Sequence, residues 1–123
     1  MASGPRRDFF QEGIDLFNSG KFFECHEAWE EIWKHAHGEE KLFLHGLIQA
    51  AVAILHAQRG NLEGARTLRD KSLKKLDRFD SERGGIALNE LRNSLRKFFE
   101  TALSGGTTPL PPPPQILRVP VEK

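Results

Sequence analysis

The sequence predicts an all-helical fold: a compact bundle of about five helices, built from antiparallel helical hairpins and followed by an extended proline-rich C-terminal tail. Residues that favour strands are scarce, with three Val and six Ile against fifteen Leu, ten Ala and nine Phe. Six of the seven prolines lie at or after Pro109, and the stretch from Arg6 to Thr108 has none, as successive helices require. A chain of 123 residues has room for one hydrophobic core.

Apolar residues recur at helical spacing along most of this proline-free stretch. We expect helices at residues 5–18, 21–36, 40–59, 61–79 and 86–103. The apolar stripe of the second helix consists of Phe22, Cys25, Trp29, Ile32, Trp33 and Ala36. The fourth and fifth helices have similar stripes, and stripes of this kind face the core of a bundle.

Two short segments forty residues apart resemble each other: residues 18–22, Asn-Ser-Gly-Lys-Phe, and residues 58–62, Gln-Arg-Gly-Asn-Leu. In each segment a glycine, Gly20 or Gly60, is expected to end one helix in the left-handed conformation just before the next helix begins. Such a turn makes a tight antiparallel hairpin, as in tetratricopeptide-type repeats, although two copies are too few for a solenoid.

The third helix is predicted to lie at the centre of the bundle. From Leu42 to Ala57 there is no Lys, Arg, Asp or Glu, and apolar residues occupy nearly all sides. This stretch is too short and too polar for a membrane span. Gly46 costs about 1 kcal/mol relative to Ala inside a helix, which is tolerable if another helix crosses closely there.

The composition changes after residue 104, so we divide the chain into a helical bundle domain, 1–104, and a Gly/Pro-rich C-terminal tail, 105–123. The run from Pro111 to Pro114 favours an extended polyproline conformation. Such a run can dock on an aromatic groove. The favoured alternative is a tail that packs back on the bundle through Ile116, Leu117, Val119 and Val121.

The formal net charge of +1 argues against strong sequence-independent binding to nucleic acid or to an acidic membrane. Between Arg66 and Arg83, basic residues are interleaved with acids, a pattern typical of a solvated face with internal ion pairs. One cysteine excludes a disulfide within the chain, and the N-terminal residues lack the apolar run of a secretory signal. We therefore expect a cytoplasmic protein.

Three polar side chains interrupt the third helix on one face: His45, Gln49 and His56. A buried polar group without a partner costs about 1–3 kcal/mol, so these side chains need hydrogen-bonding groups opposite them. If the second and third helices form an antiparallel hairpin, His26 faces Gln49 and Glu30 faces His45. The sequence therefore predicts a His-Glu-His-Gln cluster inside the bundle.

This cluster predicts a binding site for a small ligand or a protein partner. Its borders are His26, Glu27, Glu30, Trp33 and Gln49. The indole of Trp33 would supply an apolar wall that strengthens electrostatic interactions. An alternative is a purely structural polar network that only fixes the register of the two helices.

A further alternative is a metal-dependent hydrolase, because the segment from His26 to Glu30 contains a His-Glu-x-x-Glu motif. A divalent ion such as zinc, manganese or iron would be held by His26, Glu30 and His45, with Gln49 as a fourth ligand or just behind them. Glu27 or Glu30 would then be the catalytic acid/base. The sequence itself assigns neither a reaction nor a substrate.

Structural roles are expected for His56, Arg59 and Asn61, at the other end of the hairpin. His56 can bond to Asn61 or to a free backbone group, and Arg59 can reach a carboxylate. Cys25 faces the core beside Trp29, and because adjacent residues on a helix point apart, it does not form a nucleophile and base pair with His26. We therefore interpret Cys25 as a packed thiol and not as a nucleophile.

Five segments, in order, resemble the signature of a family of small helical proteins from bacteria, archaea and plastids. They are Gly13 to Gly20, Phe22 to Glu30, Gly46 to Ala50, His56, and Arg59 to Ala65. The family is catalogued as the domain of unknown function three hundred and nine, and the resemblance covers roughly Gly13 to Leu76. It implies an all-helical bundle and no agreed activity.

The resemblance also bears on the predicted site. The family's motif residues match His26, Glu27, Glu30, Gln49, His56, Arg59, Gly60 and Asn61. The family usually has Gln where this chain has His45, which weakens the metal alternative. The expected partner is a protein or a small molecule, and binding to a membrane or to nucleic acid is not expected. A homodimer is a further alternative, because nine Phe and two Trp are many for a chain of this size and some of them could cover a dimer surface.

Overall fold

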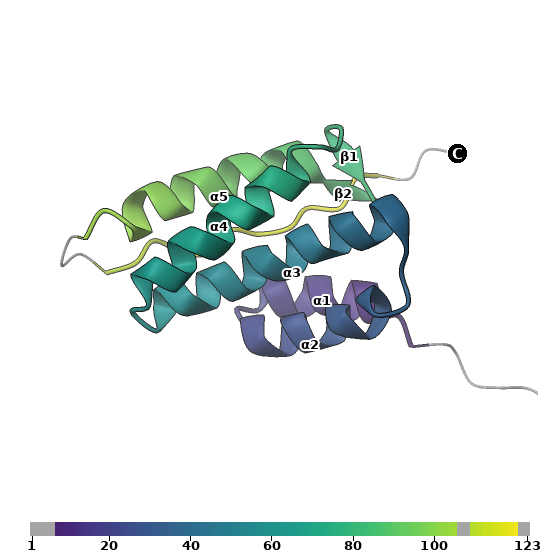
Figure 1. The fold of residues 1–123 in the computed structure, drawn as a ribbon, viewed down its shortest axis with the longest axis horizontal. Coiled ribbons are helices and arrows are strands. Elements are labelled where there is room, and N and C mark those ends of the chain that lie inside the picture. The colour runs from purple at the N-terminus through teal and green to yellow at the C-terminus, as the bar shows by residue number, and fades with distance from the viewer. Residues whose placement is uncertain (1–6, 106–108, 121–123) are drawn as a thin grey trace, which may run out of the picture.

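Helices account for most of the computed structural model, which describes residues 7–105 and 109–120 (Figure 1). In chain order these residues form α1 (Phe9–Asn18), α2 (Phe22–Trp33), α3 (Gly38–Gln58), α4 (Leu62–Leu76), β1 (Glu82–Arg83), β2 (Ile86–Ala87) and α5 (Leu88–Ala102). The predicted all-helical class is confirmed, with a small antiparallel β-hairpin added within the described ranges. No helix in that part of the chain has the length and apolar character needed to cross a bilayer.

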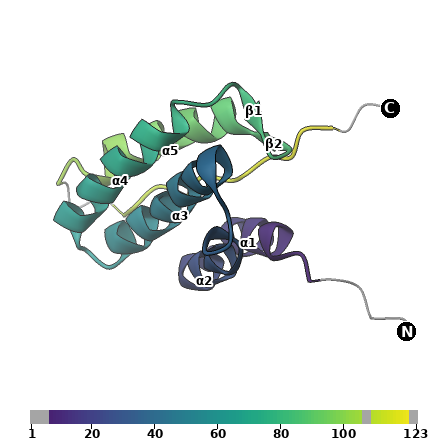
Figure 2. The ribbon, with the colours of Figure 1, turned by 45° about the vertical axis from the view of Figure 1, so that its right-hand side comes forward.

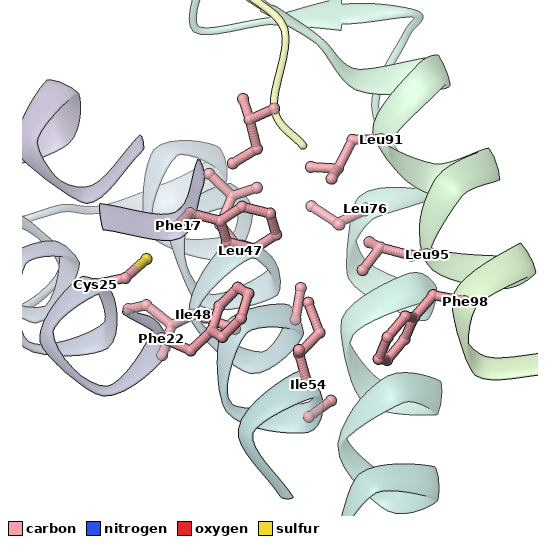
Figure 3. Packing of buried hydrophobic residues seen from close by; sticks show 14 of the residues in the cluster. Phe17, Phe22, Cys25, Leu47, Ile48, Ile54, Leu76, Leu91, Leu95 and Phe98 are labelled. Carbon is pink, nitrogen blue, oxygen red and sulfur yellow. The ribbon is translucent and has the colours of Figure 1, made fainter. Parts of the chain in front are cut away.

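The central helix is α3, as the sequence predicts (Figures 1 and 2). The hairpin of α1 and α2 packs on one side of it, and α4 and α5 lie on the other side. Figure 3 shows how side chains from both sides meet at α3, including Phe22 from α2, Leu76 from α4 and Phe98 from α5. Burial on nearly all sides explains why the middle of α3 contains no charged residue.

The two predicted glycine turns adopt the same conformation. Gly20 has φ 78° and Gly60 has φ 79°, both in the left-handed region that favours glycine. In the first turn the Lys21 N–H donates to the Leu16 carbonyl, and in the second the Asn61 N–H donates to the His56 carbonyl, each at 2.8 Å. These turns end α1 and α3 and start α2 and α4.

The connection between α4 and α5 differs from the prediction. The fourth helix ends at Leu76 and not at residue 79, and the fifth begins at Leu88 and not at residue 86. Between them Gly84 and Gly85, with φ 62° and 73°, form the turn of the β-hairpin. The buried guanidinium of Arg92 donates to the carbonyls of Leu76 and Phe79 at 2.6 and 2.8 Å. A cation on carbonyls at and just beyond the C-terminus of α4 stabilises the end of the helix.

The tail runs back along the bundle to the β-hairpin (Figures 1 and 2). Ile116 is buried, and the Asn18 side chain accepts from its N–H at 2.7 Å and donates to its carbonyl at 2.9 Å. Leu117, which is also predicted to pack on the bundle, is exposed. Val119 is partly buried, and Val121 lies outside the described residues.

Beyond Ile116 the tail is joined to the β-hairpin by backbone hydrogen bonds. The Ala87 N–H donates to the Leu117 carbonyl at 2.8 Å, and the Val119 N–H donates to the Gly85 carbonyl at 2.9 Å. The Arg118 guanidinium lies 5.7 Å from the centre of the Phe10 ring, at the beginning of α1. The end of the described tail is therefore next to the beginning of the first helix.

The α1–α2 hairpin depends on close contact at Gly13. Trp29 is fully buried, and its Nε1 donates to the Phe10 carbonyl at 3.1 Å. A Cβ added at Gly13 would overlap the indole ring of Trp29. A glycine at this position therefore allows α1 to lie directly on the indole.

We expect Gly13→Ala to lower the free energy of unfolding by about 1–3 kcal/mol or more, because the added methyl group overpacks against Trp29. The matched control is Asp15→Ala, on an exposed part of the same helix, which should change stability by less than about 0.5 kcal/mol. Urea unfolding followed by tryptophan fluorescence measures both variants. Equal and small effects would show that α1 does not contact Trp29 in this way.

Candidate functional site

A groove between α3 and α4 joins part of the predicted polar cluster to basic residues of α4. Its volume is about 630 Å³, within the range of small-molecule sites. The residues that line it are Leu42, His45, Gln49, Lys71, Lys74, Lys75 and Arg78. We call it the α3–α4 groove.

The four basic residues of the groove, here called the cation stripe, lie on the last turns of α4 and just beyond its end: Lys71, Lys74 and Lys75 on the helix and Arg78 in the turn that follows. The spacings of three and four residues place Lys71, Lys74 and Lys75 on one face of α4. Across residues 7–105 and 109–120, no ion pair joins any of them to an acid. The stripe therefore presents uncompensated positive charge to the groove.

The acids interleaved with the cation stripe pair with other residues. Asp70 accepts from Arg69 at 2.8 Å, and Asp77 accepts from Arg96 of α5 at 2.6 Å. The predicted internal ion pairing of this face is therefore correct for Arg69 and wrong for the cation stripe. Lys71, Lys74 and Lys75 share one face of α4, whereas Arg69 lies on another face.

The groove exists because α4 crosses α3 closely at Gly46, as the sequence predicts. The Ser72 hydroxyl donates to the Gly46 carbonyl at 2.7 Å. A Cβ added at Gly46 would lie 3.2 Å from the Cβ of Lys75. Because α3 and α4 run antiparallel, this crossing places Lys75 beside His45.

His45 is half-buried and lies among positive charges. Its ring packs against Trp33 of α2, with ring centres 5.5 Å apart. Burial lowers the pKa of His45, and the charges of Lys75, Lys71 and Lys41 lower it further. The imidazole is therefore neutral at pH 7, with one nitrogen able to donate and the other able to accept.

The cations of the stripe also act on each other. Burial lowers the pKa of Lys75, and the neighbouring charges of Lys71 and Lys74 lower it further. Like charges held together at a partly buried position repel, and an anion bound between them removes that repulsion. The electrostatics of the groove thus favour a negatively charged occupant.

Gln49 lies on the α3 side of the groove. Its side chain is 8% exposed, and Oε1 is buried without a hydrogen-bond partner in the described part of the chain. An atom of this kind costs about 1–3 kcal/mol in stability. A ligand group or an ordered water that donates to Oε1 would remove this cost.

The predicted site residues on α2 lie outside the α3–α4 groove. His26 Nε2 lies 3.3 Å from Glu30 Oε2, one turn along the same helix, and the Glu30 side chain is about half exposed. Glu27 is exposed and lines a separate hollow between α1 and α2, together with Glu12 and Glu24. The predicted ligand-binding residues are therefore divided between different surfaces.

The α2–α3 contact also differs in detail from the prediction. Trp33, and not Glu30, packs against His45. The His26 Nδ1 and Trp33 Nε1 atoms are buried without hydrogen-bond partners among the residues described. The Lys41 ammonium lies 4.5 Å from the centre of the Trp33 ring and covers it. The four residues of the predicted cluster are therefore not all in contact with one another.

The predicted metal ligands are not brought together. Within residues 7–105 and 109–120, no three His, Cys, Asp or Glu side chains form a group that could hold a metal ion, and this includes His26, Glu30 and His45. The physical reason is that Glu30 turns to His26 along its own helix, while His45 lies against Trp33 and faces α4.

The residues with predicted structural roles lie near the α3–α4 turn. Asn61 Nδ2 donates to His56 Nδ1 at 3.2 Å, and Asn61 Oδ1 accepts from the Gly64 N–H at 3.0 Å, which caps α4. Arg59 is exposed. Cys25 is fully buried, and burial raises the pKa of its thiol far above the usual range, which suits a packed thiol.

Comparison with known families agrees with the resemblance in the sequence. The family model described as "Domain of unknown function (DUF309)" matches residues 10–68. These residues are a DUF309 domain. The DUF309 segment extends from α1 into α4, so it includes His45 and Gln49 and ends before Lys71. The cation stripe therefore lies beyond the part of this chain that the family model covers.

Two bacterial relatives are also uncharacterised. The protein YpuF of Bacillus subtilis (strain 168) is 43% identical over 62 residues, which is 50% of this chain and 36% of YpuF. A protein of Aquifex aeolicus (strain VF5) is 28% identical over 110 residues, which is 89% of this chain and 31% of the Aquifex protein. The matched part thus spans about a third of each relative, 36% and 31%.

The lowered pKa of His45 predicts a pH dependence of stability. Because the unfolded chain takes up this proton first, His45 makes the free energy of unfolding fall as pH drops below about 6.5. His45→Gln removes this contribution. Unfolding in urea at pH 7.5 and 5.5 should therefore show that acid destabilises the variant less than the unmodified protein. An equal acid-induced loss in both proteins would contradict the assigned environment of His45.

Proposed function

We propose that this chain is a binding module that holds an anionic ligand in the α3–α4 groove, at the end of its DUF309 domain. The supporting observation is the position of the cation stripe. Its four residues, without acidic partners in the described ranges, lie beside the neutral imidazole of His45 and the buried amide of Gln49.

The chemistry of the groove suits an anion. Among the described residues no carboxylate lines it. Lysine ammonium groups and an arginine guanidinium supply only donors, and they can surround an oxyanion from several directions. Neutral His45 adds a further donor beside Lys75. Most cations of the stripe are exposed, so salt should weaken the attraction.

The proposal keeps the binding role that the sequence predicts and moves the site by one helix. Gln49 remains in it, and Trp33 supports it by packing on His45. The carboxylates of Glu27 and Glu30 would repel an anion, and both lie outside the groove. The electrostatic contrast between the two sides of α3 is therefore part of the argument.

We expect sulfate to bind in the groove, with backbone amide shifts in NMR spectra concentrated around His45, Gln49 and the cation stripe. Reversing two charges in Lys71→Glu/Lys75→Glu should weaken sulfate binding by at least about tenfold, because the anion loses two attractions and gains two repulsions. Titration at low ionic strength measures the dissociation constant of each protein.

The matched control is Lys21→Glu/Lys97→Glu, which changes the net charge equally at exposed positions away from the groove, at the N-cap of α2 and on α5. Its sulfate affinity should stay within about twofold of the unmodified protein, since distant surface charges are screened. Equal losses in the two double variants would contradict a localised site. Sulfate-induced shifts spread evenly over the surface would contradict it as well.

A further inference from the structure

We infer that the ligand of the α3–α4 groove is a short oligophosphate, with at least two phosphate groups bound along the cation stripe. This inference rests on the proposed anion-binding function and names its ligand class. The charge, the length and the two chemically different ends of the groove support it.

The positive charge of the groove favours a ligand with more than one phosphate group. The lining contains four formal positive charges, from three lysines and Arg78, and no carboxylate among the described residues. A terminal phosphate group has a charge of about −1.5 to −2 near pH 7. One such group leaves about half of the positive charge unbalanced, whereas a chain of two or three phosphates matches the stripe.

The length of the cation stripe also favours a ligand with several phosphate groups. Lys71 and Lys75 are four residues apart, which corresponds to about 6 Å along the axis of α4, and Arg78 lies farther on, in the turn beyond the end of the helix. The groove volume of about 630 Å³ is also several times that of one small oxyanion. A linear ligand with anionic groups at both ends can use the whole stripe, while a single phosphate can occupy only one part of it.

The two ends of the groove differ in chemistry. At the inner end Lys71 and Lys75 lie near His45 and Gln49, where the unpartnered Oε1 favours a protonated phosphate oxygen or a hydroxyl as donor. The antiparallel helices place Leu42 and Arg78 at the outer end, where the guanidinium fork suits two oxygens of a terminal phosphate. Two inequivalent anionic positions follow.

A nucleic acid strand fits these features less well. No aromatic side chain lines the groove in the described part of the chain, and the ring of Trp33 is covered by Lys41 and His45. Asp70 of α4 is paired with Arg69, and Asp77, which follows α4, is paired with Arg96, so these arginines do not extend the positive surface for a longer polyanion. The groove therefore favours a short ligand.

The test is calorimetric titration of the full chain with orthophosphate, pyrophosphate and tripolyphosphate at constant ionic strength and without divalent metal. We expect tripolyphosphate to bind at least about tenfold more tightly than orthophosphate. Arg78→Ala should reduce this preference at least about threefold. It should leave the affinity for orthophosphate within about twofold of that of the unmodified protein, because orthophosphate occupies the inner end. Lys74→Ala, a second exposed position, should behave similarly.

The matched control is Arg66→Ala, which removes the same charge from an exposed position on another face of α4 and should leave the preference unchanged. If all three anions bind within twofold of each other and still depend on Lys71 and Lys75, the oligophosphate inference is wrong and the proposed anion site stands. If none of them binds, both are wrong. A single-stranded oligonucleotide that binds more tightly than tripolyphosphate, through the same residues, would replace the inference with a nucleic-acid surface.

Discussion

The close crossing of α3 and α4 at Gly46 is the constraint on which both the core and the groove depend. The missing side chain lets α4 approach until the Ser72 hydroxyl reaches the Gly46 carbonyl. This contact fixes the rotation of α4 about its axis, so that Leu76 is fully buried while the cation stripe stays at the edge of the interface. The same rotation brings Lys75 beside His45, which accounts for the electrostatics of the groove.

Much of the fold could be predicted because its causes are local. Apolar spacing located the helices, and left-handed glycines located the turns at Gly20 and Gly60. The uncharged middle of the third helix indicated its central position, and Gly46 indicated the close crossing. The β-hairpin could not be predicted in this way, since the group that ends α4 is the guanidinium of Arg92, sixteen residues from Leu76 along the chain.

The candidate site could be predicted only in part, because it depends on which helix faces which. The polar face of α3 was correct as a feature, and His45 and Gln49 do line the groove. Their predicted partners on α2 were misplaced, since a shift of about one helical turn puts Trp33, and not Glu30, against His45. The cation stripe was missed because charge order along a sequence does not say which acids turn towards α5. In the structure Asp77 does so and pairs with Arg96.

The contact of Arg118 with Phe10 brings the two ends of the described chain close together. This bears on how the chain can be joined to other domains, since it matches only part of its longer relatives. The described chain enters and leaves the bundle on the same side (Figures 1 and 2), and there the Arg118 side chain reaches the Phe10 ring. A unit with adjoining ends can be spliced between other domains without forcing them apart.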